Sequence, residues 1–300
     1  MVDPDRTPVD PDIAQSEPPL PSPIQEMTPY EPEPASLAVV PAPSATIVKL
    51  PWPGEPAFPS WTYLDVMAVL GTTVVVILLF SLIALGLVRQ IPAYRHDSIV
   101  ALAANPLVVV GSQVVAYPVV VAFIILLVRS RTQEPFLQAI RWNWPLHGAT
   151  AYFVLGVILA FAVQLLSRAL PIPKSLPIDK FFYSATSAYL MAVFGTTLAP
   201  LLEELFFRGL LYPLLRRSLK VVWAVAITAA VFAAIHGAQL GYAWGPIFSI
   251  FIVGVALTLV RERTDSVAAS FLTHCGYNSS LFVVLWLASD HFQHLEKVAG

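Results

Sequence analysis

Charged residues are scarce in this 300-residue chain: Asp, Glu, Lys and Arg make up 12% of it, whereas apolar residues make up 57%. Soluble domains carry about 25% charged residues, so this composition excludes an ordinary soluble domain for most of the chain and indicates a membrane protein. Cysteine is nearly absent. Because Cys275 is the only one, no disulfide can form within the chain, and cysteine usage does not reveal the redox compartment.

Motifs of several membrane protease chemistries are also missing. The sequence contains no HExxH pair for a zinc protease, no GxSG for a serine protease of the membrane and no GxGD for a pair of catalytic aspartates. The N-terminus lacks a basic region followed by an apolar core, so we expect no signal peptide. These absences restrict the choice of mechanism for any hydrolytic activity.

The first 60 residues differ in composition from the rest. They hold 16 of the 27 prolines, nine acidic residues and two basic ones, a net charge of −7, whereas residues 61–300 carry +5. Such a segment cannot bury enough apolar surface to offset its ordering entropy. We therefore expect a disordered tail over 1–60, a helical bundle over 61–290 and a short C-terminal tail over 291–300. The first tail is either an inert linker or a docking site for a partner.

Long charge-free stretches predict membrane-spanning helices, because a bilayer core about 30 Å thick needs roughly 20 apolar residues. The longest stretch, 221–260, would measure about 60 Å as one helix. Three glycines and Pro246 interrupt it, so it is expected to form a helical hairpin. The sequence thus predicts an all-α, polytopic membrane bundle with about seven spanning helices. The charge-free stretches are 66–88, 98–128, 142–167, 181–202, 221–260 and 266–289.

Loop charges give the expected orientation. With the N-terminus inside the cell, the inner loops hold eight Lys and Arg residues and the outer side holds six. This small excess favours a cytoplasmic N-terminus, and the span layout fits the cytoplasmic membrane of a bacterium. The expected partners are membrane lipids and a membrane-embedded or lipidated peptide substrate, and no nucleic acid.

Ionisable side chains within the apolar stretches are the candidate functional residues, since each costs roughly 2.5–3.5 kcal/mol at mid-membrane. Two glutamates and an arginine come near the predicted end of the fourth span, and two histidines lie in later spans. Residues four apart share one face of a helix. The ionisable candidates are Glu203, Glu204, Arg208, His236 and His274, and Phe232 and Asn278 each lie four residues from one of the histidines.

Together these groups describe amide hydrolysis inside a bilayer. A carboxylate beside an imidazole can take a proton from water, and an imidazole with an amide can donate hydrogen bonds to an oxyanion. Glu204 and Arg208 can form a neutral pair, with or without a functional role. This chemistry needs no cofactor. The alternative is a zinc ion bound by Glu203, His236 and His274, whose side chains are of the types that bind zinc.

Three segments resemble the motifs of one family. EELFFRG, FAAIH and HCGYN are similar to EExxxR, FxxxH and HxxxN of the CAAX protease and bacteriocin-processing family, in the same order and on successive apolar segments. The resemblance covers roughly residues 61–290 and implies a compact intramembrane helical bundle with glutamate-type endopeptidase activity. It implies that Glu203 and His236 activate water and that His274 and Asn278 form the oxyanion hole. Supporting roles fall to Glu204, Arg208 and Phe232.

Two other functions are compatible with the same residues. A catalytically silent member of such a family could act as a scaffold or chaperone, and the proline-rich tail would then recruit partners. Buried carboxylates and histidines are also typical of proton-coupled transporters. The sequence shows no inverted repeat or paired broken helices, so a transporter ranks last.

Overall fold

The computed structural model describes residues 59–145 and 148–295, and these residues form helices and no strand. The all-α prediction is confirmed. Almost all of the predicted N-terminal tail lies outside the described residues, as do residues 296–300. The boundaries expected for the two tails therefore stay predictions.

The described residues include six helices long and apolar enough to cross a membrane, and a seventh apolar helix that has 15 residues. At 1.5 Å per residue the short helix measures about 22 Å, less than a bilayer core of about 30 Å. The seven expected segments are thus six full-length helices and one short helix. They are α1 (Tyr63–Val88), α3 (Pro106–Arg131), α5 (Ala149–Ser167), the run of α6 to α8 (Ala185–Ser218), α9 (Val221–Ile235), α10 (Trp244–Thr264) and α11 (Val267–Ala288).

The predicted break in the stretch 221–260 is confirmed. Between α9 and α10 the backbone turns, and Gly241 adopts a positive φ of 59° that favours glycine. Non-helical backbone within a membrane protein is tolerated where it lines a cavity. Gln239 of this turn lines two cavities, so the break contributes directly to the hollow part of the bundle.

The stretch 98–128 also divides, at a proline. Pro106 lies in the first turn of α3, where its missing N–H is not needed, and the Asn105 side chain accepts a hydrogen bond there from a backbone N–H. Pro118 lies within α3 itself. The short elements outside the long helices are η1 (Pro92–Tyr94), α2 (Ile99–Ala103), α4 (Phe136–Ala139) and η2 (Pro177–Phe182).

The helix that carries the two glutamates is longer than the sequence suggested. We expected them near the end of the fourth span, but the helix continues to Ser218, so that expectation was wrong. Charged residues need not end a helix when they are paired, and Glu204 and Arg208 are both paired and fully buried. The run consists of α6 (Ala185–Thr196), a turn at Thr197, α7 (Leu198–Glu204), the π-helical segment η3 (Leu205–Leu211) and α8 (Tyr212–Ser218).

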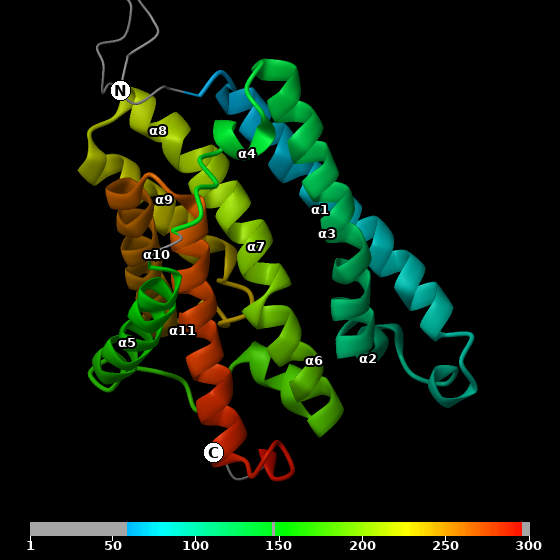
Figure 1. Ribbon diagram of the computed structural model, residues 1–300. Coiled ribbons are helices and arrows are strands. Elements are labelled where there is room, and N and C mark those ends of the chain that lie inside the picture. The colour runs from blue at the N-terminus through cyan, green and yellow to red at the C-terminus, as the bar shows by residue number, and fades with distance from the viewer. Residues whose placement is uncertain (1–58, 146–147, 296–300) are drawn as a thin grey trace, which may run out of the picture. The chain divides into compact units, whose positions relative to one another are not determined.

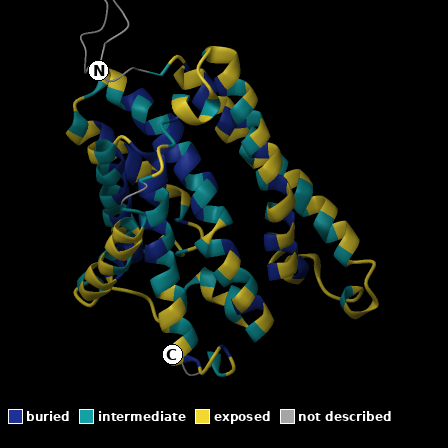
Figure 2. Ribbon diagram, viewed as in Figure 1, coloured by how far each residue is buried: buried dark blue, intermediate teal, exposed yellow. Residues whose placement is uncertain are grey.

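Helix packing places Glu204 in the most buried part of the described bundle. Figure 1 shows α1 beside α3 as a hairpin, and α11 close to α5 and α7. Buried residues gather on α7 to α11, whereas α1 and α5 are exposed over most of their length (Figure 2). Most of the exposed side chains are apolar, such as Leu64 and Leu82 on α1. Such outer faces are expected where a helix contacts lipid.

Candidate active site

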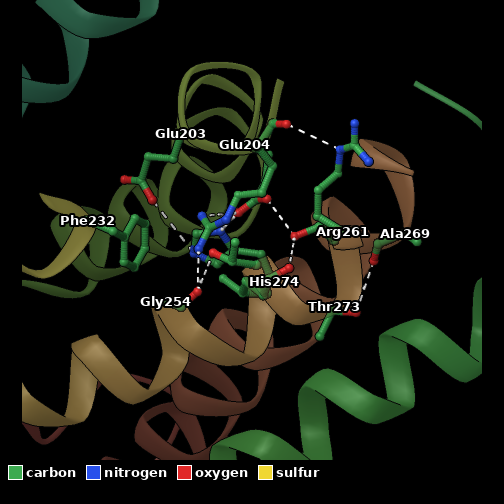
Figure 3. Close-up of polar contacts among 12 residues, drawn as sticks. Glu203, Glu204, Phe232, Gly254, Arg261, Ala269, Thr273 and His274 are labelled. Atoms are coloured by element: carbon green, nitrogen blue, oxygen red, sulfur yellow. Dashed lines mark hydrogen bonds and ion pairs between the residues drawn. The ribbon is translucent and has the colours of Figure 1, made fainter. Parts of the chain in front are cut away.

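Glu204 is fully buried and accepts hydrogen bonds from three side chains (Figure 3). Its Oε1 lies 2.8 Å from Arg208 Nη1 and 2.9 Å from His274 Nδ1. Its Oε2 accepts from the Ser270 hydroxyl at 2.7 Å. Arg208 also donates to the Gly254 carbonyl at 3.1 Å. The buried charge is therefore compensated within the protein, and the network joins α7, η3, α10 and α11.

Glu203, the next residue along the helix, faces two imidazoles. Its Oε1 lies 3.9 Å from His236 Nε2, and its Oε2 lies 3.7 Å from His274 Nε2. Both distances exceed a direct hydrogen bond and are short enough for one water molecule to touch the carboxylate and an imidazole together. The pairing of Glu203 with His236, predicted from sequence, thus corresponds to a real proximity.

Each histidine is oriented through its Nδ1 atom. His236 Nδ1 lies 2.7 Å from the Phe232 carbonyl, and His274 Nδ1 lies against the Glu204 carboxylate. Carbonyl and carboxylate oxygens only accept hydrogen bonds, so in each contact Nδ1 carries the hydrogen. A neutral imidazole then has its lone pair on Nε2. Both histidines consequently present Nε2 to Glu203.

Asn278 follows His274 by one helical turn, and its side chain reaches the same cavity. The cavity measures about 300 Å³ and is lined by all four residues expected to be catalytic. The Asn278 amide nitrogen donates one hydrogen to the Gly195 carbonyl at 2.6 Å. An amide nitrogen carries two hydrogens, so one remains for a ligand. The four residues that line the cavity are Glu203, His236, His274 and Asn278.

Phe232 packs beneath the polar groups. Its ring is buried and lies 4.7 Å from the Arg208 guanidinium carbon, within the range of a cation–π contact. The same ring is 4.9 Å from the His236 ring and 5.9 Å from the His274 ring, measured between centroids. Phe232 therefore contacts residues of all three motifs, which fits the supporting role implied by the resemblance.

Sequence reasoning missed the donors that complete the site. Ser270 lies one turn before His274, on the face that also holds Asn278, so its spacing was a usable signal. Trp61 Nε1 and Arg261 Nε donate to the carbonyls of Leu210 and Arg208. Both carbonyls belong to the π-helical segment η3, and no sequence pattern links donors so distant along the chain.

The proposed zinc ligands lie around one cavity, although the described part of the chain contains no group of three His, Cys, Asp or Glu side chains recognised as able to hold a metal ion. The three residues of the zinc alternative also serve the water-based chemistry, since a carboxylate and an imidazole suffice for that. The zinc mechanism and the metal-free mechanism therefore involve the same side chains, Glu203, His236 and His274.

Comparison with known proteins finds one similar family. A family model described as Type II CAAX prenyl endopeptidase Rce1-like matches residues 185–280, which run from α6 into α11 and contain all three motifs. The resemblance to the CAAX protease family is thus confirmed over these residues. The match supports a CAAX-type intramembrane endopeptidase in general terms, and with the six long apolar helices it supports an integral membrane protein. No curated protein and no solved structure matches the chain.

Proposed function

We propose that this protein hydrolyses a peptide bond within a membrane-associated or prenylated protein or peptide, with Glu203 as the general base. The observation that carries the proposal is the carboxylate of Glu203 facing Nε2 of both His236 and His274. The three side chains line one cavity, where a substrate carbonyl could approach them. Such a convergence of costly polar groups inside an apolar bundle is typical of a functional site.

In the proposed reaction a water molecule donates one hydrogen bond to Glu203 and one to Nε2 of His236. The carboxylate takes a proton as the water oxygen bonds to the substrate carbonyl carbon, and the carbonyl electrons move to its oxygen. When the tetrahedral intermediate collapses, the C–N bond breaks and the proton held by Glu203 passes to the leaving amine. Atoms and charges then balance without a cofactor.

His274 and Asn278 are proposed to stabilise the oxyanion. The free N–H of Asn278 supplies one hydrogen bond. His274 supplies a second through its Nε2, which faces the same cavity and donates when it carries a hydrogen. Glu204 then acts through His274, which it orients, and Arg208 compensates the charge of Glu204. Donors fixed in advance in this way are an effective source of transition-state stabilisation.

The setting proposed for this activity is the bacterial cytoplasmic membrane, with the N-terminus in the cytoplasm. Lys and Arg are slightly more frequent in the loops that this orientation places inside. The substrate would then be cleaved within or next to the bilayer. Docking of a partner on the N-terminal tail belongs to the same proposal, since acidic proline-rich segments recruit proteins.

The test compares membranes from cells that carry the native protein with membranes from cells that carry Glu203→Gln, by mass spectrometry of new peptide termini. Loss of the general base should lower cleavage by about 10²- to 10⁴-fold, so termini specific to the native protein should disappear. Glu134→Gln, in an exposed loop, is the matched control and should behave as the native protein. Identical termini in all three samples, at equal protein levels, would refute proteolysis and favour the scaffold.

A further inference from the structure

A second cavity, of about 290 Å³, lies on another side of Glu203. It is bounded by α1 and α3 together with α7, η3 and α9, whereas the first cavity is bounded mainly by α6, α10 and α11. The two cavities share Glu203, His236 and Gln239. The proposed general base and its imidazole partner therefore line both cavities, of which the reaction as described uses only one.

Most of the wall of the second cavity is apolar, but α1 and α3 contribute three polar side chains, Thr73, Gln113 and Tyr117. The Tyr117 hydroxyl donates to Gln113 Oε1 at 2.8 Å, which fixes the orientation of the Gln113 amide. Among the described residues, the Gln113 side chain makes one hydrogen bond, through its oxygen, and its amide nitrogen donates none. Two N–H groups are thus available to a ligand in the cavity.

The free amide N–H groups of Gln113 distinguish a hydrocarbon chain from a peptide as the ligand of this cavity. A hydrocarbon chain has no polar atom, so it gains nothing from an amide donor and would leave that donor unsatisfied. An extended peptide has a carbonyl at every residue, and an unpaired carbonyl away from water costs several kcal/mol. The combination of apolar walls and one oriented amide matches an apolar peptide segment.

We propose that the cavity between α1, α3, α7 and α9 binds the substrate polypeptide on one side of the scissile bond, with Gln113 donating to a substrate carbonyl. The inference rests on the proposed peptidase activity. A substrate then lies across Glu203 with one part in each cavity, so the bond that is cut is internal to the bound segment. Gln113 and Tyr117 are positioning residues for substrate in this scheme.

The kinetic test uses the full-length protein in nanodiscs and a library of apolar ten-residue peptides, each with one S-farnesylated cysteine. For the best-cleaved peptide, Gln113→Met and Tyr117→Phe should raise KM about five- to tenfold and leave kcat within about twofold, as expected for loss of one hydrogen bond in binding. Gln90→Met, on an exposed glutamine beyond the end of α1, is the matched control and should leave KM unchanged. An unchanged KM in both cavity variants would overturn the inference and leave the peptidase activity standing.

Photo-crosslinking separates the two proposals. In a Glu203→Gln background, benzoylphenylalanine replaces Ile77 of the second cavity, Leu281 of the first, or Leu87 on the exposed face of α1. Crosslinks from position 77 to peptide residues of the library support the inference, even if the native protein cleaves nothing and the peptidase proposal fails. Crosslinks from position 77 only to the farnesyl chain or to lipid, or no more peptide than from position 87, would overturn it.

Discussion

His274 joins the two glutamates of the site: its Nδ1 lies 2.9 Å from Glu204 Oε1, and its Nε2 lies 3.7 Å from Glu203 Oε2. His236 contacts only one of them and is oriented by a backbone carbonyl instead, that of Phe232. The two imidazoles therefore face the same carboxylate but have different structural roles. One belongs to the buried ion network that holds the helices together, and the other lies at the end of α9.

Replacing the two histidines should separate catalysis from stability. We expect His236→Ala and His274→Ala both to abolish cleavage, because each removes an imidazole next to Glu203. Only His274→Ala should lower stability strongly, by about 1–3 kcal/mol, since it deprives the buried Glu204 of a hydrogen bond. Thermal unfolding in detergent beside a cleavage assay measures both effects. Equal losses of stability in the two variants would contradict the assignment.

Removing the charge partner of Glu204 should be more damaging still. In Arg208→Met the buried carboxylate keeps its two other donors but loses its compensating charge, which typically costs about 3–5 kcal/mol. The double variant Glu204→Gln/Arg208→Met removes both charges and should unfold at a higher temperature than Arg208→Met alone. Arg129→Met, on an exposed position near the end of α3, is the control for loss of an arginine. A double variant less stable than Arg208→Met would argue against an ion pair of this kind.

The close crossing of α5 and α11 gives a prediction about the helix that carries His274. A Cβ atom added to Gly156 would overlap the Thr273 carbonyl, and one added to Gly276 would overlap the Phe153 carbonyl. Gly156→Ala should therefore force the helices apart and cost about 1–3 kcal/mol, with a parallel loss of activity as His274 shifts. Gly71→Ala, where nothing lies within 4 Å, should be neutral or stabilising. Equal melting temperatures for the two variants would refute the crossing.

Local sequence patterns predicted much of the candidate site, and they missed contacts between residues that are far apart in the sequence. The i, i+4 spacing of Glu204 and Arg208 predicts an ion pair, and the structure contains it. The same spacing could not reveal that His274 completes that pair, because the contact joins residues 70 positions apart. The helix end predicted near Glu203 was wrong for a related reason. The charged residues were expected to end the membrane span, but Glu204 and Arg208 form an ion pair and the helix continues through the π-helical segment.

The π-helical segment illustrates the same limit. Widening a helix there leaves backbone carbonyls in need of donors, and Trp61 and Arg261 supply them from outside the matched motifs. Trp61 is 2% exposed, and its indole N–H donates to the Leu210 carbonyl, 149 positions along the chain. Such a role depends on three-dimensional packing, so a single sequence gives no signal for it. The catalytic roles themselves stay predictions until variants are assayed.

Metal dependence is open to a direct test. Because Glu203 and His236 can activate water by themselves, we expect the purified protein to retain its full rate after treatment with a strong zinc chelator. The same chelator saturated with zinc before addition serves as the control for effects on lipid or detergent. Loss of activity with the free chelator, restored by added zinc and absent in the control, would instead assign Glu203, His236 and His274 as zinc ligands. In that case the Glu203 carboxylate would bind the metal, and another group would have to serve as the general base.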